Sequence, residues 1–416
     1  MKVLILTGKF GMGHVAAAEA VADRLRWRYA DAEIRIVDLM EYIYPKLHPY
    51  IYRAFNAVVN KMPRIYNAMI CLDCYLSKLP FRGKWVSGDI VGDLVAQWQP
   101  DVLVSTWLIG SKYVGAYKKK TGDDIPFVTC ITDILAFDEW LSPSTDAYIV
   151  GGEETKEALI AKGVDAHSIY VGGIPVRRAF DSCGSSAAGE GKEVLMMGGG
   201  LGFIPGAEEL LSALDAMPGV HTTVITGRNK KLYEKLRGKY RHVDVLGFTR
   251  EVPALMAAAD VLVTKAGGAT TFEAIWAELP LFVAVPYFEQ EKVNAAYVEE
   301  KELGQVVWEC GTDGAQALKA LLQDRDRRQR IKEHMRAMKE QMNSCGIERL
   351  MDTLLETCGR KGRENHEKEI HRTLNSAGGL HGVCAAAGGC RADEPFYPEA
   401  SGQNTAFGRC GVVSHV

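Results

Sequence analysis

The sequence has 416 residues, of which 47% are hydrophobic and 24% charged, and its formal net charge is -3. These values are ordinary for a soluble globular protein, and the small net charge argues against binding of nucleic acid by the whole chain. The length favours two domains of roughly 150 to 200 residues. No apolar run approaches the roughly 20 residues of a membrane span, and the opening MKVLIL is too short for a signal-peptide core. We therefore expect a cytoplasmic protein.

Short β-rich apolar runs alternate with amphipathic stretches of helical length up to about residue 310, a pattern typical of parallel α/β architecture. A first round predicts six strands, at residues 3–7, 33–38, 101–106, 126–132, 147–150 and 169–172. A second round begins with EVLMMGGG and continues through HTTVITG, VDVLGF, DVLVTK, LFVAVP and QVVWE. We predict two α/β halves that face each other across a cleft.

The two halves are separated by DSCGSSAAGEGK, a small, polar and glycine-rich stretch that reads as a linker. The predicted domains are therefore residues 1–180 and 193–358, with 181–192 between them. A charged helical stretch at about 324–356 closes the second domain, and the composition of 359–416 predicts disorder.

In the first half, residues 39–70 interleave tyrosine, proline, basic and large apolar side chains. One hypothesis is a surface that touches a membrane, because aromatic and cationic residues together favour the headgroup region. The alternative is a long helical insertion whose apolar face is buried. The sequence favours neither over the other.

The stretch GKFGMGHVAAAEAV leaves the first predicted strand through three glycines, Gly8, Gly11 and Gly13. Glycines there allow a tight turn above the carboxyl end of the strand, where open α/β sheets bind ligands. His14 follows at the start of a helix and can take a proton from a hydroxyl near neutral pH. The helix is expected to pack through a stripe formed by Val15, Ala18, Ala22 and Leu25.

Two other interpretations of this stretch stay open. His14 can be a capping or core histidine. The glycines can belong to a dinucleotide site, with Asp38 at the next strand end as the ribose ligand, although their spacing is not GxGxxG.

The second half has its own glycine-rich turn, at Gly199, Gly200 and Gly202, between a strand and a helix. Such a turn exposes backbone N–H groups to a phosphate, and the dipole of the following helix favours negative charge. Arg228, in TGRN after the next strand, is a candidate diphosphate contact.

The most informative stretch runs from 260 to 298. A turn of small residues at 266–270 precedes Glu273, whose carboxylate can accept both hydroxyls of a ribose. Gln290, Glu291 and Asn294 stand at the following strand–helix junction, where amide and carboxylate groups suit sugar hydroxyls.

Seven motifs carry a resemblance to a known family, in chain order: VLILTGKFGMGH, QPDVLVSTW, ITDILAFDEW, GGIPV, TGRNKKLYEKL, VLGFTREVPALMAAADVLVTKAGGATTFEA and EQEKVNA. The chain resembles the monogalactosyldiacylglycerol synthase and processive diacylglycerol glucosyltransferase family over about residues 1–310. More distantly it is similar to the enzyme that adds N-acetylglucosamine to the undecaprenyl-linked peptidoglycan precursor. The resemblance implies a GT-B fold, with two facing Rossmann-like domains, and an inverting glycosyltransferase.

The resemblance also implies roles for single residues. His14 is the general base, and Gly11, Gly13, Asp133 and Trp140 line the acceptor side. The nucleotide-sugar set comprises Gly199, Gly200, Gly202, Arg228, Asn229, Gly247, Phe248, Thr249, Lys265, Gly267, Gly268, Thr270, Glu273, Gln290, Glu291 and Asn294. Within that set, 247–249 meets the uracil through backbone, Glu273 takes the ribose, and Gln290 with Glu291 reads the sugar.

The chain departs from the family pattern at two places. Family members commonly carry a histidine between Asp133 and Trp140, where this chain has Phe137 or Asp138. They commonly read PGQE where this chain reads FEQE at 288–291. The first departure leaves the lipid acceptor open, and the second leaves the sugar open.

We thus expect transfer of a hexose from UDP-glucose or UDP-galactose to a lipid hydroxyl, most simply that of diacylglycerol, at the inner membrane face. No cofactor or metal is expected, because the DxD match at 324–326 lies in an arginine-rich helical run. Cys71 and Cys74 form a lone CxxC, and His381 with Cys384, Cys390 and Cys410 lies in the tail, so neither group predicts a metal site. The alternatives are a UDP-sugar 2-epimerase, N-acetylglucosaminyl transfer to an undecaprenyl-linked acceptor, and a non-catalytic nucleotide-sugar sensor.

Overall fold

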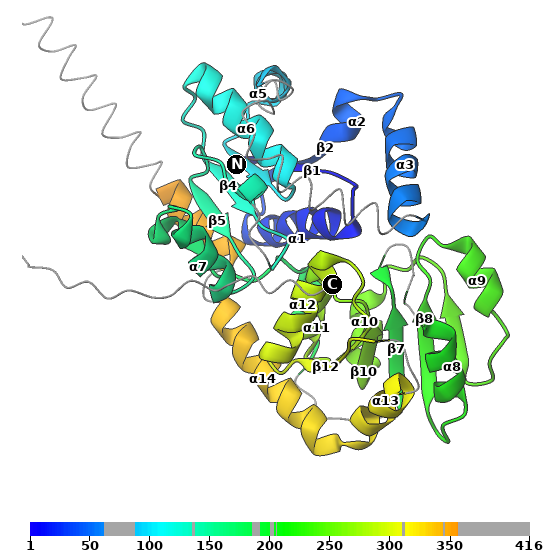
Figure 1. The fold of residues 1–416 in the computed structure, drawn as a ribbon. Coiled ribbons are helices and arrows are strands. Elements are labelled where there is room, and N and C mark those ends of the chain that lie inside the picture. The colour runs from blue at the N-terminus through cyan, green and yellow to red at the C-terminus, as the bar shows by residue number, and fades with distance from the viewer. Residues whose placement is uncertain are drawn as a thin grey trace, which may run out of the picture. The chain divides into compact units, whose positions relative to one another are not determined.

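The computed structural model describes residues 1–61, 88–134, 138–184, 192–199, 204, 206–309, 313–343 and 346–356. Its strands form two six-stranded sheets in which every neighbouring pair is parallel (Figure 1). The first sheet has the order β2-β1-β3-β4-β5-β6 and the second the order β12-β11-β10-β7-β8-β9. The predicted α/β fold with two Rossmann-like halves is confirmed.

The first sheet is built from β1 (Lys2–Thr7), β2 (Glu33–Asp38), β3 (Val102–Ser105), β4 (Phe127–Cys130), β5 (Ala147–Ile149) and β6 (Ile169–Tyr170). Its helices are α1 (Met12–Arg28), α2 (Leu39–Ile43), α3 (His48–Lys61), α5 (Asp89–Trp98), α6 (Leu108–Thr121) and α7 (Glu153–Ala161), with 3-10 turns η2 (Asp138–Trp140), η3 (Ala166–Ser168) and η4 (Arg178–Phe180). Strands β1, β3 and β4 are almost wholly buried because helices cover both faces.

The second sheet is built from β7 (Glu193–Met197), β8 (His221–Ile225), β9 (Val243–Leu246), β10 (Val261–Thr264), β11 (Leu281–Ala284) and β12 (Gly304–Val307). Its helices are α8 (Ala207–Asp215), α9 (Lys230–Leu236), α10 (Val252–Ala258), α11 (Gly268–Ala277), α12 (Glu289–Glu300), α13 (Asp313–Gln323) and α14 (Arg325–Asn343). Strands β10 and β11 are wholly buried.

All twelve predicted strands are present, but most end one or two residues before the predicted limit. The reason is local: the polar and glycine residues after each apolar run already belong to the turn into the next helix. The helix after the second glycine-rich turn also starts later than expected. Gly206 has φ 68°, so α8 begins only at Ala207, and its first turn carries Glu208 and Glu209.

Helix α1 lies at the boundary between the two halves and contacts α11 (Figure 1). Three members of its predicted stripe, Ala18, Ala22 and Leu25, are fully buried, whereas Val15 is half-buried. Ala17 of the same helix belongs to the core cluster of the second sheet. One helix thus contributes to both cores.

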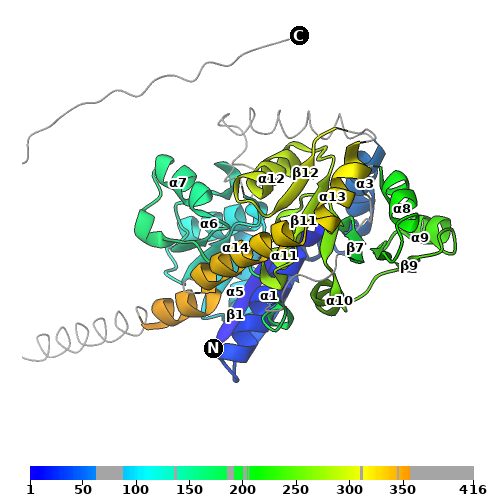
Figure 2. The ribbon, with the colours of Figure 1, turned by 90° about the horizontal axis from the view of Figure 1, so that it is seen from below.

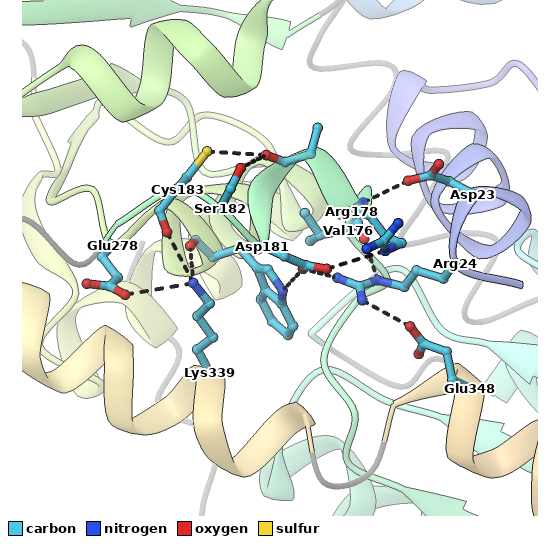
Figure 3. Close-up of polar contacts among 12 residues, drawn as sticks. Asp23, Arg24, Val176, Arg178, Asp181, Ser182, Cys183, Glu278, Lys339 and Glu348 are labelled. Carbon is cyan, nitrogen blue, oxygen red and sulfur yellow. Dashed lines mark hydrogen bonds and ion pairs between the residues drawn. The ribbon is translucent and has the colours of Figure 1, made fainter. Parts of the chain in front are cut away.

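Arg24 of α1 joins three segments at this boundary (Figure 3). Its guanidinium donates to the Val176 carbonyl oxygen at 2.6 Å, to Asp181 Oδ1 at 2.7 Å and to Glu348 Oε1 at 3.1 Å. Asp181 also accepts from Trp276 Nε1 of α11 at 3.2 Å. The residues after β6, which cross from one sheet to the other, are therefore bound to both halves.

The end of the described chain returns to the first sheet. Helix α14 runs across the second half, and its continuation lies beside the first sheet (Figure 2). Ile347, Leu350 and Met351 are buried in the core cluster that contains β1 and α1. The sequence assigns 193–358 to one domain, whereas apolar side chains at 347–351 complete the core of the other.

Among the described residues, every helix is either too short or too polar to cross a bilayer.

Candidate active site

The loop between β1 and α1 brings His14 to the boundary of the two halves. Gly8 is required here by close approach, because an added Cβ would lie 2.8 Å from the Trp107 ring. That ring stacks on Phe10 with centroids 5.3 Å apart, which shapes the loop before the helix. Gly11 is extended, and no side chain caps the first N–H groups of α1. The open helix N-terminus that the sequence predicts is present.

Two threonines fix His14. Its Nδ1 lies 2.7 Å from Thr132 Oγ1, just beyond the carboxyl end of β4. Its backbone oxygen accepts a hydrogen bond from Thr106 Oγ1 at 2.9 Å. Although the side chain is partly accessible, the surrounding protein desolvates the ring and lowers the pKa of His14 to about 4. The imidazole is therefore neutral at physiological pH, which is the form a general base needs.

Asp133 and Trp140 lie next to this histidine, as the sequence predicts for the acceptor side. Trp140 Nε1 donates to Asp133 Oδ2 at 3.3 Å, and the Trp140 ring lies 6.2 Å from that of His14. Burial raises the pKa of Asp133 to about 6, and the Trp140 hydrogen bond opposes this rise. The family position at Phe137 lies outside the described residues, whereas Asp138 pairs with Lys162.

The N-terminus of α11 meets this cluster from the second half. A Cβ at Gly268 would lie 2.6 Å from the Thr132 carbonyl oxygen, so only glycine fits without a shift. A Cβ at Gly13 would lie in ordinary contact, 3.8 Å from Ala269 Cβ. The helix that carries His14 and the helix that carries Glu273 therefore meet close to their N-terminal ends.

Glu273 is half-buried on α11, and burial raises its pKa to about 7, while the positive charge of Arg177 opposes this rise. Within the part of the chain that the structure describes, no side chain hydrogen-bonds its carboxylate. The carboxylate therefore retains its capacity to accept hydrogen bonds, as a ribose ligand requires.

Two of the predicted sugar-reading residues are already engaged. Glu291 is buried, lies 3.0 Å from Lys265 Nζ, and accepts the backbone N–H groups of Tyr287 and Phe288. Asn294 is buried and donates to the Ala266 carbonyl oxygen at 2.9 Å. These contacts fix α12 to the turn after β10. Gln290, on the same helix, is half-buried.

A second cluster joins the ends of β8 and β9. The Arg228 guanidinium lies 5.6 Å from the centre of the Phe248 ring, and both side chains are exposed. Asn229 accepts the Leu232 N–H at the start of α9, and Thr249 accepts the Glu251 N–H. An exposed cation beside an aromatic face suits a nucleoside diphosphate.

The other residues of the predicted nucleotide-sugar set are mostly glycines in the turns of the second sheet. Gly199 has φ 70°, as a glycine turn requires, whereas Gly200 and Gly202 lie outside the described residues. Gly247, Gly267 and Thr270 are half-buried at strand ends or helix starts of the second sheet. Cys71, Cys74 and the tail from 357 lie outside the described residues.

Asp38 does not fit the alternative role of a ribose ligand. Its Oδ1 caps α2 by accepting the N–H groups of Met40 and Glu41, and it also accepts the Tyr52 hydroxyl at 2.6 Å. Lys9 lies 3.3 Å from its other oxygen. The carboxylate is thus used to close the β2–α2 turn, which argues against a dinucleotide site there.

Asp324 of the DxD match accepts the Arg327 N–H at 2.8 Å, near the start of α14. In the described part of the chain, no three histidine, cysteine, aspartate or glutamate side chains are placed to share a metal ion.

Sequence reasoning missed three residues of the site: Thr132, Trp107 and Arg177. Thr132 stands directly before the predicted Asp133, at the carboxyl end of a strand, and that position is the signal that could have found it. Trp107 and Arg177 contribute through contacts between segments far apart in the chain, which no local pattern records.

The pH dependence of catalysis should report the low pKa of His14. A base acts in its deprotonated form, so a pKa near 4 moves the acid limb of kcat/KM below the ordinary histidine value of 6.5. Asp133 and Glu273 also titrate nearby, at about 6 and about 7, so the profile should be measured for the parent, for Glu273→Gln and for the double variant Asp133→Asn with Glu273→Gln. We expect the acid limb of the double variant to lie below 6.5; a limb at or above 6.5 in that variant would contradict the assignment.

Two six-stranded parallel α/β sheets, joined where α1 contacts α11, have the architecture of the GT-B fold. Among solved structures, the kitacinnamycin glycotransferase has a TM-score of 0.58 at 15% identity, covering 86% of this chain and 98% of that chain. UDP-GlcNAc 2-epimerase from Neisseria meningitidis has a TM-score of 0.52 at 12% identity, covering 86% and 100%. At these identities the likeness concerns the fold.

Sequence comparison gives matches in both halves of the chain. Residues 14–176 match the monogalactosyldiacylglycerol (MGDG) synthase family, and residues 194–350 match the glycosyltransferase family 28 C-terminal domain. A processive diacylglycerol beta-glucosyltransferase from Bacillus cereus strain AH187 is 28% identical over 400 residues, covering 90% of this chain and 97% of that protein. The first half of the chain is thus similar to MGDG synthases, and the second half is similar to family 28 glycosyltransferases.

Proposed function

We propose that this glycosyltransferase moves a hexose from a UDP-sugar to the hydroxyl of diacylglycerol, with inversion at the anomeric carbon. The observation that carries the proposal is the neutral His14 at the N-terminus of α1, held against the helix that bears Glu273. The name of the Bacillus cereus relative, a processive diacylglycerol beta-glucosyltransferase, supports diacylglycerol as acceptor. No other cofactor is proposed.

In the proposed reaction, a lipid hydroxyl attacks the anomeric carbon while Nε2 of His14 takes its proton. The new C–O bond forms as the bond to the diphosphate breaks, and UDP leaves with the electron pair. Charge then develops on the diphosphate, where Arg228 and backbone donors of the turn at Gly199 are candidates to offset it. Glu273 accepts the ribose hydroxyls.

The test incubates the protein with UDP-glucose, UDP-galactose or UDP-N-acetylglucosamine, each with diacylglycerol, with an undecaprenyl-linked acceptor or without lipid, and analyses both the lipid extract and the UDP-sugar. We expect a hexosyldiacylglycerol that forms only when both substrates are present. Release of an epimerised UDP-sugar without lipid would instead establish the 2-epimerase alternative. Transfer restricted to an undecaprenyl-linked acceptor from UDP-N-acetylglucosamine would overturn the diacylglycerol assignment.

We further propose that α2 and α3 rest on the membrane that supplies the lipid. Tyr44, Leu47 and Tyr50 expose 44%, 57% and 65% of their surfaces, and the basic Lys46 and Arg53 are exposed beside them. Large apolar side chains that face water are costly unless they meet a partner, and basic side chains favour anionic headgroups.

The double substitution Leu47→Asp with Tyr50→Asp should lower binding to anionic vesicles that contain diacylglycerol by roughly tenfold or more, because it removes apolar area and adds repulsion. Ile160→Asp on α7, which replaces another exposed apolar residue, is the matched control. Cosedimentation measures the bound fraction. Equal binding by the double variant and the control would contradict the proposed docking face.

A further inference from the structure

We propose that Thr132 is a positioning residue for the general base: it holds His14 in the Nδ1–H tautomer and thereby presents a free Nε2 lone pair to the acceptor hydroxyl. This role of Thr132 rests on the proposed function, because the hydrogen bond to His14 Nδ1 orients the base of that reaction.

The geometry leaves His14 one ring nitrogen for chemistry. Its Nδ1 lies 2.7 Å from Thr132 Oγ1, a short hydrogen-bond distance, and Thr132 is only 5% exposed, so water competes poorly for the contact. A backbone hydrogen bond with Thr106 also acts on the ring and opposes the fall of the His14 pKa. Because Nδ1 is the ring nitrogen within hydrogen-bond distance of a side chain, we assign Nε2 to the substrate. A nitrogen that accepts a proton must first lack one, so the neutral ring carries its proton on Nδ1 and donates it to Oγ1.

The same contact suits the product of proton transfer. When Nε2 accepts the proton, the ring becomes an imidazolium with two N–H donors, and Oγ1 still accepts one of them. The neighbouring carboxylate of Asp133 is engaged with Trp140 Nε1, and within the described residues no carboxylate is hydrogen-bonded to His14. The base is thus oriented by a neutral hydroxyl.

Thr132 packs against the opposite half of the molecule. Its carbonyl oxygen lies against the N-terminus of α11, so closely that a Cβ at Gly268 would come within 2.6 Å. Helix α11 also carries Glu273, so the residue that contacts the base packs against the helix that carries the predicted ribose ligand. Orientation of the base therefore depends on how the two halves meet.

The first test compares Thr132→Val, which keeps the size but removes the acceptor, with Thr132→Ser, which keeps the hydroxyl. We expect Thr132→Val to lower kcat roughly ten- to a hundredfold while KM for the UDP-sugar changes less than about twofold, and Ser to restore most of the rate. Thr129→Val is the matched control, since Thr129 is a buried residue of β4 that bonds Thr145 and Ser111 away from the site. An unchanged kcat in Thr132→Val would overturn the proposal.

The second test reads the tautomer directly, without substrate. Nitrogen-15 NMR of the imidazole, assigned by comparison with His14→Gln, should show Nδ1 protonated and Nε2 unprotonated in the parent, and this preference should be lost in Thr132→Val. A parent that carries its proton on Nε2 would overturn the proposal. Since this measurement needs no transfer activity, it separates failure of this inference from failure of the proposed function.

The link to α11 is tested by a double-mutant cycle. Gly268→Ala should lower kcat in the parent, because the added methyl displaces Thr132. In the Thr132→Val background, Gly268→Ala should lower kcat by a smaller factor, because the hydrogen bond from Thr132 to His14 is already absent. If Gly268→Ala lowered kcat by the same factor in both backgrounds, the proposed coupling between α11 and His14 would be overturned.

Discussion

His14→Ala is expected to lower kcat by roughly a hundred- to ten-thousandfold, equivalent to about 3 to 5 kcal/mol in the activation barrier. The reason is that the variant removes the imidazole that we propose as the general base. UDP affinity should change little, because the proposed nucleotide contacts at Arg228, Phe248 and Glu273 belong to the other half. Turnover is measured as hexosyldiacylglycerol formed, and UDP affinity by calorimetry.

The control for this experiment is His167→Ala, since His167 is exposed on η3 and takes no part in the site. Its turnover should match that of the parent. Turnover by His14→Ala comparable to that of His167→Ala would remove the basis for the proposed mechanism. Loss of UDP binding in His14→Ala would show that proton abstraction and nucleotide binding are not divided between the two halves.

Arg24→Leu is expected to destabilise the fold by about 3 kcal/mol and to lower the thermal midpoint by roughly 5 °C. Arg24 is 8% exposed, and its loss removes a donor from Glu348 and from the Val176 carbonyl oxygen and leaves Asp181 with Trp276 Nε1. Breaking a buried ion pair costs more than an exposed one, because a charge or carbonyl is left desolvated and unpaired. Scanning calorimetry measures the midpoint.

Arg26→Leu is the matched control, because Arg26 lies on the same helix but is exposed and makes one long contact, 3.3 Å to the Ile34 carbonyl oxygen. We expect its midpoint to stay close to that of the parent. The same midpoint for both variants would contradict the role of Arg24 at the junction. We expect the thermal midpoint of Arg24→Leu to fall further than that of Arg26→Leu, and amide hydrogens of residues 176–183 to exchange faster in Arg24→Leu.

The fold could be predicted because its signals are local. Each strand is a short run of β-branched and apolar residues followed by glycine or polar residues, and these runs fixed both the number of strands and their positions. The order of strands within each sheet requires pairing across the sequence and was not predicted. The packing of Ile347, Leu350 and Met351 in the core of the first sheet also depends on contacts between distant segments, which the predicted boundary of 193–358 does not describe.

The site was predictable where residues stand at the carboxyl ends of strands. His14, Asp133 and Trp140 come together as expected, and Arg228 meets Phe248. Such positions are informative because all strands of a parallel sheet end at the same edge.

Residue type alone could not reveal which polar groups are already occupied. Glu291 and Asn294 carry the chemistry of sugar recognition, yet their side chains bind Lys265 and backbone groups of the protein itself. Thr132 shows the converse, since a threonine carries no distinctive signal until its hydroxyl is found 2.7 Å from the base. Hydrogen-bond partners are a property of the folded chain.

The central claim is a single displacement in which His14 activates the acceptor, and the anomeric configuration of the product tests it most directly. The protein is supplied with UDP-α-glucose or UDP-α-galactose and diacylglycerol, and the coupling constant of the anomeric proton of the purified glycolipid is measured by NMR. A β-linked sugar is the result that direct displacement predicts. An α-linked sugar would mean retention of configuration and would contradict the account.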